Sequence, residues 1–259
     1  MKVAYVQALG LRSVEAIHKL GSLARLAARI LRAGAVGPHR VRRYFDEIFD
    51  TGVRSLAIVC LSGATVGASL SLLGYTTLSR FGAEGFLGAL VGHALIRELG
   101  PVLTALLVTG RAGSAMAAEI ASMVQTEQLD GLRMMSIDPI GFVVTPKAFA
   151  MITVMPLLFG LFVVVALLGA RLVGVDMLGV DGGQFMGSLE SSIEFDDHVA
   201  QGLVKSVAFG TLVGLIATYR GYTSAPTSSG VSAATTGTVV TASVSILIFN
   251  YLITALWGV

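Results

Sequence analysis

Five long stretches of this sequence carry almost no charged side chain, and each is long enough to cross a lipid bilayer. They are Ser55–Ser79, Gly85–Gly110, Ala148–Ala170, Val199–Thr218 and Val239–Trp257. A membrane-spanning helix needs about 20 consecutive apolar residues. Only 13% of the residues are charged, whereas soluble domains average about 25%. The sequence therefore predicts an all-α integral membrane protein with five transmembrane helices.

Lys and Arg are distributed unequally between the loops that would connect these helices. Ten of them precede the first stretch, three lie between the second and third, and one lies between the fourth and fifth. The loops of the opposite side contain only Arg80 and Arg171. Because cytoplasmic loops are enriched in Lys and Arg, we expect a cytoplasmic N-terminus and a C-terminus on the outer, periplasmic side.

The first fifty residues have the pattern of helices that lie at a membrane surface. In residues 3–32 apolar side chains recur near helical spacing, and Arg25, Arg29 and Arg32 share one face. Such an amphipathic helix lies in the interface and meets anionic headgroups; the alternative is a cytoplasmic helix packed on a partner. Pro38 ends this pattern, and a second short helix follows as an elbow. We accordingly divide the chain into an N-terminal interfacial segment, 1–52, and a transmembrane domain, 53–259.

Two of the loops have helical patterns of their own. Met116–Met135, on the cytoplasmic side, is rich in good helix formers, and its methionine-bearing face suits either a moving partner or packing within the bundle. The outer loop, 172–198, has six acidic residues and no Lys or Arg. Its apolar side chains at helical spacing predict a short periplasmic helix that lies on the membrane surface; its acidity fits either solvation or docking of a protein. The apolar side chains are those of Phe185, Met186, Leu189 and Ile193.

Three charged residues lie within the apolar stretches: Arg97, Glu98 and Lys205. A charge at the centre of a membrane helix costs about 2.5–3.5 kcal/mol on insertion, so it needs partners, water or a function. We expect a Glu98–Lys205 pair between spans, with Arg97 directed to another partner because consecutive helical residues point about 100° apart. The cluster is either an ion pair that fixes helix register or the wall of a cavity that contacts a charged headgroup.

Small residues mark expected helix contacts in two of the spans. Gly63 and Gly67 lie four residues apart in the first, and Gly210 and Gly214 in the fourth, which is the spacing of close helix packing in membranes.

The motifs of common enzymes and of nucleotide binding are missing. The sequence contains no G-x-x-x-x-G-K-[ST] loop, no H-E-x-x-H pair and no G-x-S-x-G turn. Basic residues are not interleaved with aromatic ones, so nucleic-acid binding is not expected. We predict no catalytic and no metal-binding residues. The hypotheses are a transporter, a non-transporting scaffold, and an intramembrane lipid-modifying enzyme with Glu98 or His93 as base.

Several short motifs occur along the sequence in a distinctive order. They are Arg97-Glu98-Leu99-Gly100-Pro101, Gly110-Arg111-Ala112-Gly113-Ser114-Ala115, Ala118-Glu119-Ile120, Thr126-Glu127-Gln128, Met134-Met135, Asp138-Pro139, Gly221-Tyr222, Pro226-Thr227, Gly230-Val231-Ser232 and Ala234-Thr235-Thr236. With these motifs the sequence resembles the MlaE family of ABC-transporter permeases, and the resemblance covers nearly the whole chain.

The resemblance implies a homodimer at the centre of an inner-membrane complex of Gram-negative bacteria. The complex moves phospholipid between the inner and outer membranes and helps to maintain outer-membrane lipid asymmetry. An MlaF-like ATPase binds ATP and Mg²⁺, so this chain needs no cofactor. An MlaB-like STAS-domain subunit binds the ATPase, and an MlaD-like hexamer of MCE domains sits on the periplasmic side.

The resemblance also implies two sets of functional residues. Met116–Met135 becomes the coupling helix that docks in the ATPase. The lipid pocket lies at the dimer interface, opens toward the MCE ring, and is built from the outer half of the first span and parts of the fifth. For coupling we expect Glu119, Met123, Thr126, Glu127, Asp130 and Arg133. For the pocket and polar core we expect Leu70, Leu73, Tyr75, Leu78, Phe81, Arg97, Glu98 and Lys205.

Overall fold

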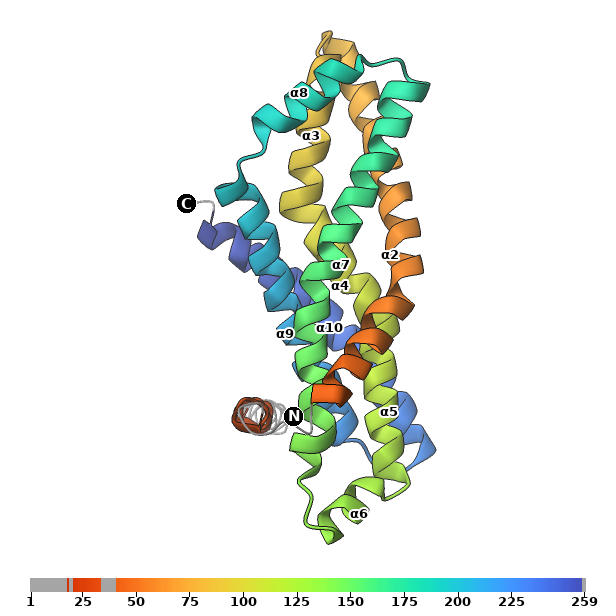
Figure 1. The fold of residues 1–259 in the computed structure, drawn as a ribbon, viewed down its shortest axis with the longest axis vertical. Coiled ribbons are helices and arrows are strands. Elements are labelled where there is room, and N and C mark those ends of the chain that lie inside the picture. The colour runs from red at the N-terminus through yellow and green to blue at the C-terminus, as the bar shows by residue number, and fades with distance from the viewer. Residues whose placement is uncertain (1–17, 19–20, 34–40, 258–259) are drawn as a thin grey trace, which may run out of the picture.

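The computed structural model describes residue 18 and residues 21–33 and 41–257, and strands are absent from these parts of the chain. Within them, five helices are long and apolar enough to cross a membrane, which confirms the predicted number. Their bounds are Arg42–Phe81, Glu84–Gln125, Ile140–Met177, Asp197–Tyr222 and Ser228–Trp257. They pack into an elongated bundle (Figure 1).

The first, fourth and fifth spans are built mainly from single α-helices. These are α2 (Val41–Leu78), α9 (Ala200–Tyr222) and α10 (Ser228–Trp257). The third span is α7 (Thr145–Arg171), extended by the π-helical segments Ile140–Val144 and Leu172–Met177.

The second span is one long helix in which α-helical and π-helical parts alternate. The α-helical parts are α3 (Leu87–His93), α4 (Gly100–Val108) and α5 (Ser114–Gln125), and the π-helical parts are Ala94–Leu99 and Thr109–Gly113. Single π-turns inside α-helices are rare and often mark functional positions. Here the first of them contains both Arg97 and Glu98.

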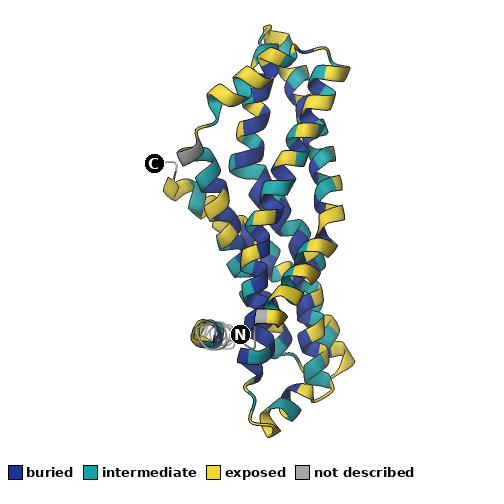
Figure 2. Cartoon of the chain, in the orientation of Figure 1, coloured by how far each residue is buried: buried dark blue, intermediate teal, exposed yellow. Residues whose placement is uncertain are grey.

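The bundle is organised around α7, which packs along both α2 and α9. Glycines bring these helices into close contact, as their spacing predicted. A Cβ atom added at Gly67 would lie only 1.8 Å from the carbonyl oxygen of Ala166. One added at Gly210 would lie 2.9 Å from the Cβ of Met155. Buried residues accordingly follow the axis of the bundle, and its outer faces are exposed (Figure 2).

The N-terminal helix, residues 21–33, crosses the bundle instead of running along it. In Figure 1 it is viewed nearly end-on, so it lies across the long axis of the molecule. Its apolar residues Leu26 and Ile30 are buried against Ile140, Val144 and Ala148. The rest of the predicted interfacial helix falls outside the described residues.

The predicted elbow is not a separate helix, because α2 runs unbroken from Val41 through the 52/53 division. No proline or glycine cluster interrupts residues 41–55, so the helix continues directly into the span.

The predicted Met116–Met135 helix is wrong as a single element. Its first half, α5, continues the second span, and α6 (Gln128–Met134) follows after a break. Glu127 has a left-handed backbone, with φ at 58°, and one such residue ends a helix.

The outer loop contains α8 (Gly182–Ser192), as its apolar spacing predicted. However, α8 packs against α3 instead of lying apart from the bundle. Phe185 is 2% exposed and belongs to the main core, whereas Met186 remains 48% exposed. The contact is close because Gly88 has no side chain: an added Cβ would lie 2.0 Å from the carbonyl oxygen of Phe185.

Candidate functional site

The charged residues of the membrane region form one cluster around the Glu98 carboxylate. Lys205 Nζ lies 3.0 Å from Glu98 Oε1, which confirms the expected pair between the second and fourth spans. The Lys205 side chain is fully buried, and that of Glu98 is 35% exposed. A buried ammonium needs a carboxylate and further acceptors to offset the loss of water.

The backbone of the second span supplies that further acceptor. Lys205 Nζ donates to the carbonyl oxygen of Arg97 at 2.9 Å. Pro101, four residues after Arg97, has no N–H and cannot make an α-helical bond to this carbonyl. Lys205 therefore binds both the Glu98 carboxylate and a backbone carbonyl oxygen of the second span.

Arg97, for which we expected a partner other than Glu98, lies beside Glu98. Its nearest carboxylate among the described residues is that of Glu98, with Arg97 Nε 3.9 Å from Oε1. The expectation assumed α-helical geometry, whereas both residues lie in the π-helical segment, where a wider turn reduces the angle between neighbouring side chains.

Two polar residues of α10 complete the cluster, and sequence reasoning missed both. Asn250 Nδ2 donates to Glu98 at 3.2 Å, and Thr254 Oγ1 donates to it at 3.1 Å. They lie four residues apart and so on one face of the helix. The sequence feature that could have identified these partners is Asn250, which is the only asparagine of the sequence and lies within the last apolar stretch.

An apolar groove of about 300 Å³ lies beside this cluster, between the first and second spans. Its lining comes from one face of α2 and from Leu99, the residue that follows Glu98. The lining residues are Thr65, Val66, Ser69, Leu70, Leu73 and Leu99.

Only part of the predicted lipid pocket coincides with this groove. Leu70 and Leu73 line it, but Tyr75 and Leu78 pack against the bundle core and Phe81 is 80% exposed in the following turn. The pocket was predicted from a continuous run of apolar residues. Successive residues of a helix point in different directions, so only some residues of that run can face the groove. Tyr75 and Leu78 share the face of the fully buried Ser71, which is turned toward the core.

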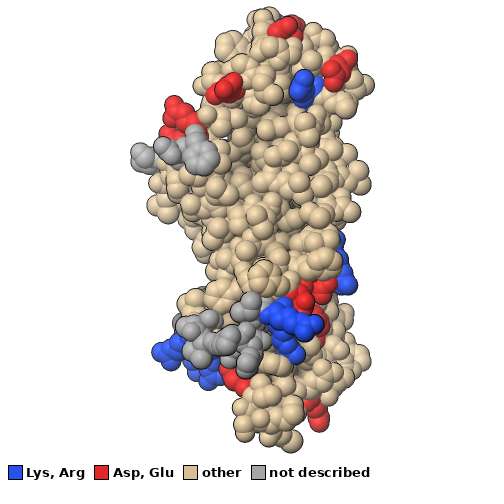
Figure 3. Space-filling view, in the orientation of Figure 1, with Lys and Arg blue, Asp and Glu red and all other residues tan. Residues whose placement is uncertain are grey.

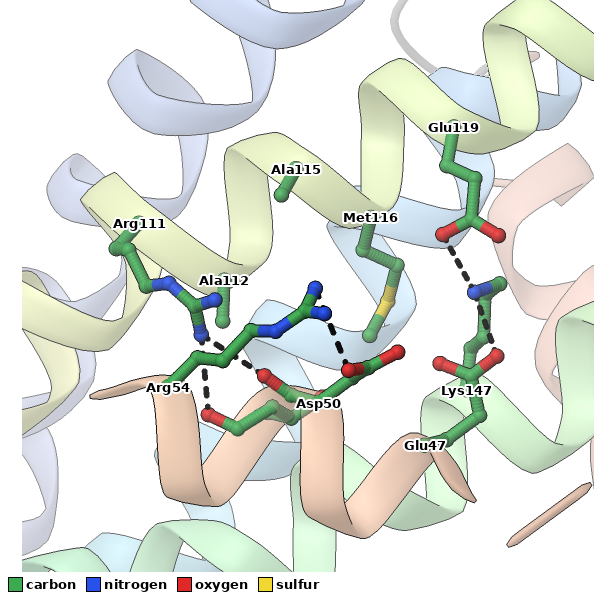
Figure 4. A pocket seen from close by; sticks show the side chains of 10 residues that line it. Glu47, Asp50, Arg54, Arg111, Ala112, Ala115, Met116, Glu119 and Lys147 are labelled. Atoms are coloured by element: carbon green, nitrogen blue, oxygen red, sulfur yellow. Dashed lines mark hydrogen bonds and ion pairs between the residues drawn. The ribbon is translucent and has the colours of Figure 1, made fainter. Parts of the chain in front are cut away.

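A second charged network joins the first three spans, toward the basic end of the bundle. Lys147, whose side chain is 4% exposed, donates to Glu47 at 2.6 Å and to Glu119 at 2.7 Å. Arg111 donates to the carbonyl oxygen of Asp50 at 2.9 Å. These residues surround a small cavity of about 90 Å³, and Figure 4 shows Lys147 between the two carboxylates.

The predicted coupling residues have unequal positions. Glu119 is held by Lys147, and Met123 packs against the core, as do Met116 and Ile120 of the same face. The methionine-bearing face of α5 therefore contacts the bundle core, which is one of the two interpretations left open by the sequence. The sequence alone did not distinguish packing within the bundle from docking of a partner, because good helix formers and methionines occur in both situations.

The remaining coupling residues surround the tip of the loop. Thr126 donates to the carbonyl of Ser122, Arg133 pairs with Asp130 at 2.7 Å, and Glu127 is exposed. Beside them Met134 and Met135 are 88% and 63% exposed. These two methionines, not those of α5, form the apolar surface at this end.

Charge is also sorted along the bundle. Lys and Arg gather over its lower part in Figure 3, near the N-terminal helix and α5, while the upper end carries mainly acidic side chains. The cluster around Glu98 lies between these ends, within the spans.

Comparison with known proteins assigns the chain to a family. The family model described as Permease MlaE matches residues 44–256. This chain belongs to the MlaE permease family. Like the other members, it is a multi-pass permease of the ABC-transporter type, and the resemblance of its motifs is confirmed.

The relatives of this MlaE permease come from several kinds of organism. The intermembrane phospholipid transport system permease protein MlaE of Haemophilus influenzae is 42% identical over 99% of this chain and 98% of its own length. A probable ABC transporter permease of Rickettsia typhi is 43% identical over 81% of both chains. The chloroplastic protein TRIGALACTOSYLDIACYLGLYCEROL 1 of Arabidopsis thaliana is 30% identical over 83% of this chain and 61% of its own.

Proposed function

We propose that this chain is the permease subunit of an ATP-driven transporter that moves phospholipid between the inner and outer membranes and so maintains outer-membrane lipid asymmetry. The observation that carries the proposal is the apolar groove beside an ionic cluster, both within the spans of an MlaE permease. The chain itself is non-catalytic, and a separate subunit hydrolyses ATP.

The groove and the cluster suit the two parts of a phospholipid. The apolar face of α2 would contact acyl chains, while Arg97, whose side chain is partly exposed, would provide a cationic group for a phosphate. Leu99 borders the groove and directly follows Glu98, so the groove and the cluster involve consecutive residues of the second span.

We place an MlaF-like ATPase at the tip formed by α6. Exposed methionines adapt to a moving surface because their side chains are flexible and polarisable, and Met134 and Met135 are the exposed pair here. An MlaB-like STAS-domain subunit would join through the ATPase. An MlaD-like hexamer of MCE domains would cover the opposite, acidic end.

The active unit that we propose is a homodimer in the inner membrane of a Gram-negative bacterium, with the N-terminus cytoplasmic and the C-terminus periplasmic. The basic residues near the N-terminal helix favour this orientation. α10 exposes a large apolar surface that includes Leu247, Tyr251 and Leu256, as expected of a helix that contacts lipid or a second copy.

Reconstitution tests the proposal. The complex of permease, ATPase and MCE-domain partner is placed in liposomes, and transfer of a labelled phospholipid is followed with and without ATP. We expect ATP-dependent transfer, which is lost in a variant of the ATPase that cannot hydrolyse ATP. ATP hydrolysis without transfer would instead favour the alternative, a scaffold that only assembles the ring and the ATPase.

Mass spectrometry of the lipid tests the enzyme hypothesis, which requires a chemically changed lipid.

A second experiment tests the docking surface. Replacing Met134 and Met135 with Ser removes the exposed apolar side chains without touching the bundle core. We expect the amount of ATPase that co-purifies with the permease to fall at least fivefold. The control is Leu157→Ser with Leu168→Ser, two exposed apolar residues of α7 far from the tip. Equal loss in both variants, or none in the first, would contradict docking at α6.

A further inference from the structure

A pocket of about 220 Å³ lies where the N-terminal helix crosses the basic end of the bundle, away from the groove and the Glu98 cluster. Its lining includes two buried apolar residues, Leu26 and Ile140. It also includes Arg25 and Arg29 of the N-terminal helix and Tyr219 and Tyr222 at the end of α9. The pocket therefore combines cationic and hydroxyl-bearing residues with apolar ones.

Within the described residues, the two arginines of this pocket have no carboxylate partner. They lie one helical turn apart, and neither forms an ion pair there. Two acids of the same end are engaged elsewhere: Asp130 pairs with Arg133, and Asp138 accepts from the backbone N–H groups of Ile140 and Gly141. In the described part of the chain, no carboxylate therefore neutralises the two positive charges at this pocket.

The tyrosine hydroxyls are positioned by neighbours. Arg133 donates to the Tyr222 hydroxyl oxygen at 2.6 Å, which leaves the phenolic proton available for another acceptor. The Tyr219 hydroxyl is 2.7 Å from Ser22 Oγ and ties the N-terminal helix to α9.

The N-terminal helix is also fixed by packing. Leu26 and Ile30 are only 6% and 3% exposed, so Arg25 and Arg29 are presented from a docked helix. A loose basic segment attracts anionic lipid through its overall charge. A fixed pair of guanidinium groups can in addition recognise one phosphate, because each presents donors in a planar fork.

We propose that this pocket binds the phosphate headgroup of an anionic phospholipid from the leaflet at the basic end of the bundle. Arg25 and Arg29 bind the phosphate oxygens, Tyr222 donates its hydroxyl proton, and Leu26 and Ile140 contact the glycerol and the first methylene groups. The bound lipid holds the N-terminal helix against the third and fourth spans. It is distinct from the cargo lipid, and the site does not depend on the proposed transport activity.

Native mass spectrometry of the purified full-length chain tests this site. The delipidated protein in neutral detergent is titrated with phosphatidylglycerol or with phosphatidylcholine. We expect a tight phosphatidylglycerol site, with an affinity at least tenfold above that for phosphatidylcholine. The double variant Arg25→Gln/Arg29→Gln should lose at least tenfold in phosphatidylglycerol affinity, and Arg25→Lys/Arg29→Lys should lose less because it keeps the charge.

The matched control is Arg32→Gln/Arg42→Gln, which removes the same charge from exposed positions outside the pocket. We expect less than a twofold change in this variant, and circular dichroism verifies that all variants are folded. Equal losses in the two glutamine variants would overturn the site in favour of diffuse attraction. Glycerol 3-phosphate is titrated separately. If it binds as tightly as phosphatidylglycerol, the pocket is a site for a soluble phosphate ester and the lipid proposal is overturned.

Discussion

At the scale of single residues, the Glu98 cluster shows how one carboxylate is shared between three spans. It pairs with the buried Lys205 and accepts hydrogen bonds from Asn250 and Thr254. Each partner comes from a helix that follows Glu98 by more than a hundred residues. The cluster therefore couples the positions of α9 and α10 to the π-helical segment of the second span.

Glu98→Ala should destabilise the permease because it leaves the fully buried Lys205 without a carboxylate. Breaking a buried pair costs about 3–5 kcal/mol, and we expect about 3 kcal/mol because Glu98 is partly exposed. Thermal unfolding in detergent measures the change, and lipid transfer should fall with insertion retained. The double variant Glu98→Ala/Lys205→Met removes both charges and should recover most of the stability. Additive losses in the double variant would show that the pair is not coupled.

The sequence allowed the Glu98–Lys205 pair to be predicted because only three charges lie within the apolar stretches, and opposite charges in a membrane need each other. It did not reveal Asn250 and Thr254 as partners, because serine, threonine and amide side chains are tolerated in membrane helices for many reasons. Nor did it reveal that Arg97 stays beside Glu98. That position depends on a local π-turn, which has no simple residue pattern.

At the scale of elements, the spans were predictable and their ends were not. Apolar length sufficed to predict the five helices, and glycine spacing predicted close contacts of α2 and α9, but not that α7 is the partner of both. The break at Glu127 was missed because α5 and α6 are both made of good helix formers, and only backbone geometry separates them.

Gly67→Ala tests the close crossing of α2 and α7. The added Cβ atom would meet the Ala166 carbonyl, so the helices must separate, at a cost of about 1–3 kcal/mol for overpacking. The matched control is Gly160→Ala in α7, where an added Cβ has no described heavy atom within 4 Å. We expect a lowered unfolding temperature for the first variant only; similar temperatures for both would contradict the crossing.

Lys147→Met tests the network that joins α2, α5 and α7. The change leaves Glu47 and Glu119 facing each other without their shared cation. Because Glu119 is half exposed, we expect about 2 kcal/mol, less than for a fully buried pair. Arg54→Met is the control, since its pair with Asp50 is exposed and is worth less than about 1 kcal/mol. Chemical or thermal unfolding in detergent distinguishes them, and equal effects would argue against a special role for Lys147.

At the scale of the whole molecule, the sorting of charge along the bundle predicts its orientation. With Cys60 replaced by Ala, a single cysteine is introduced either at Glu190 in α8 or at Met134 in α6, both exposed positions. A membrane-impermeant maleimide added to intact spheroplasts should label the first and not the second. Permeabilised cells should give equal labelling. Labelling of position 134 alone in intact spheroplasts would reverse the assignment of the two sides.

The second span has one further consequence for the working of such a machine. Its 42 residues correspond to about 60 Å of helix, twice the roughly 30 Å of hydrocarbon in a bilayer. About half of this helix therefore extends beyond the hydrocarbon layer. A movement at the α5 end reaches Glu98 along continuous helix, and the π-helical segment Thr109–Gly113 is the wide turn that lies between that end and the segment that contains Glu98.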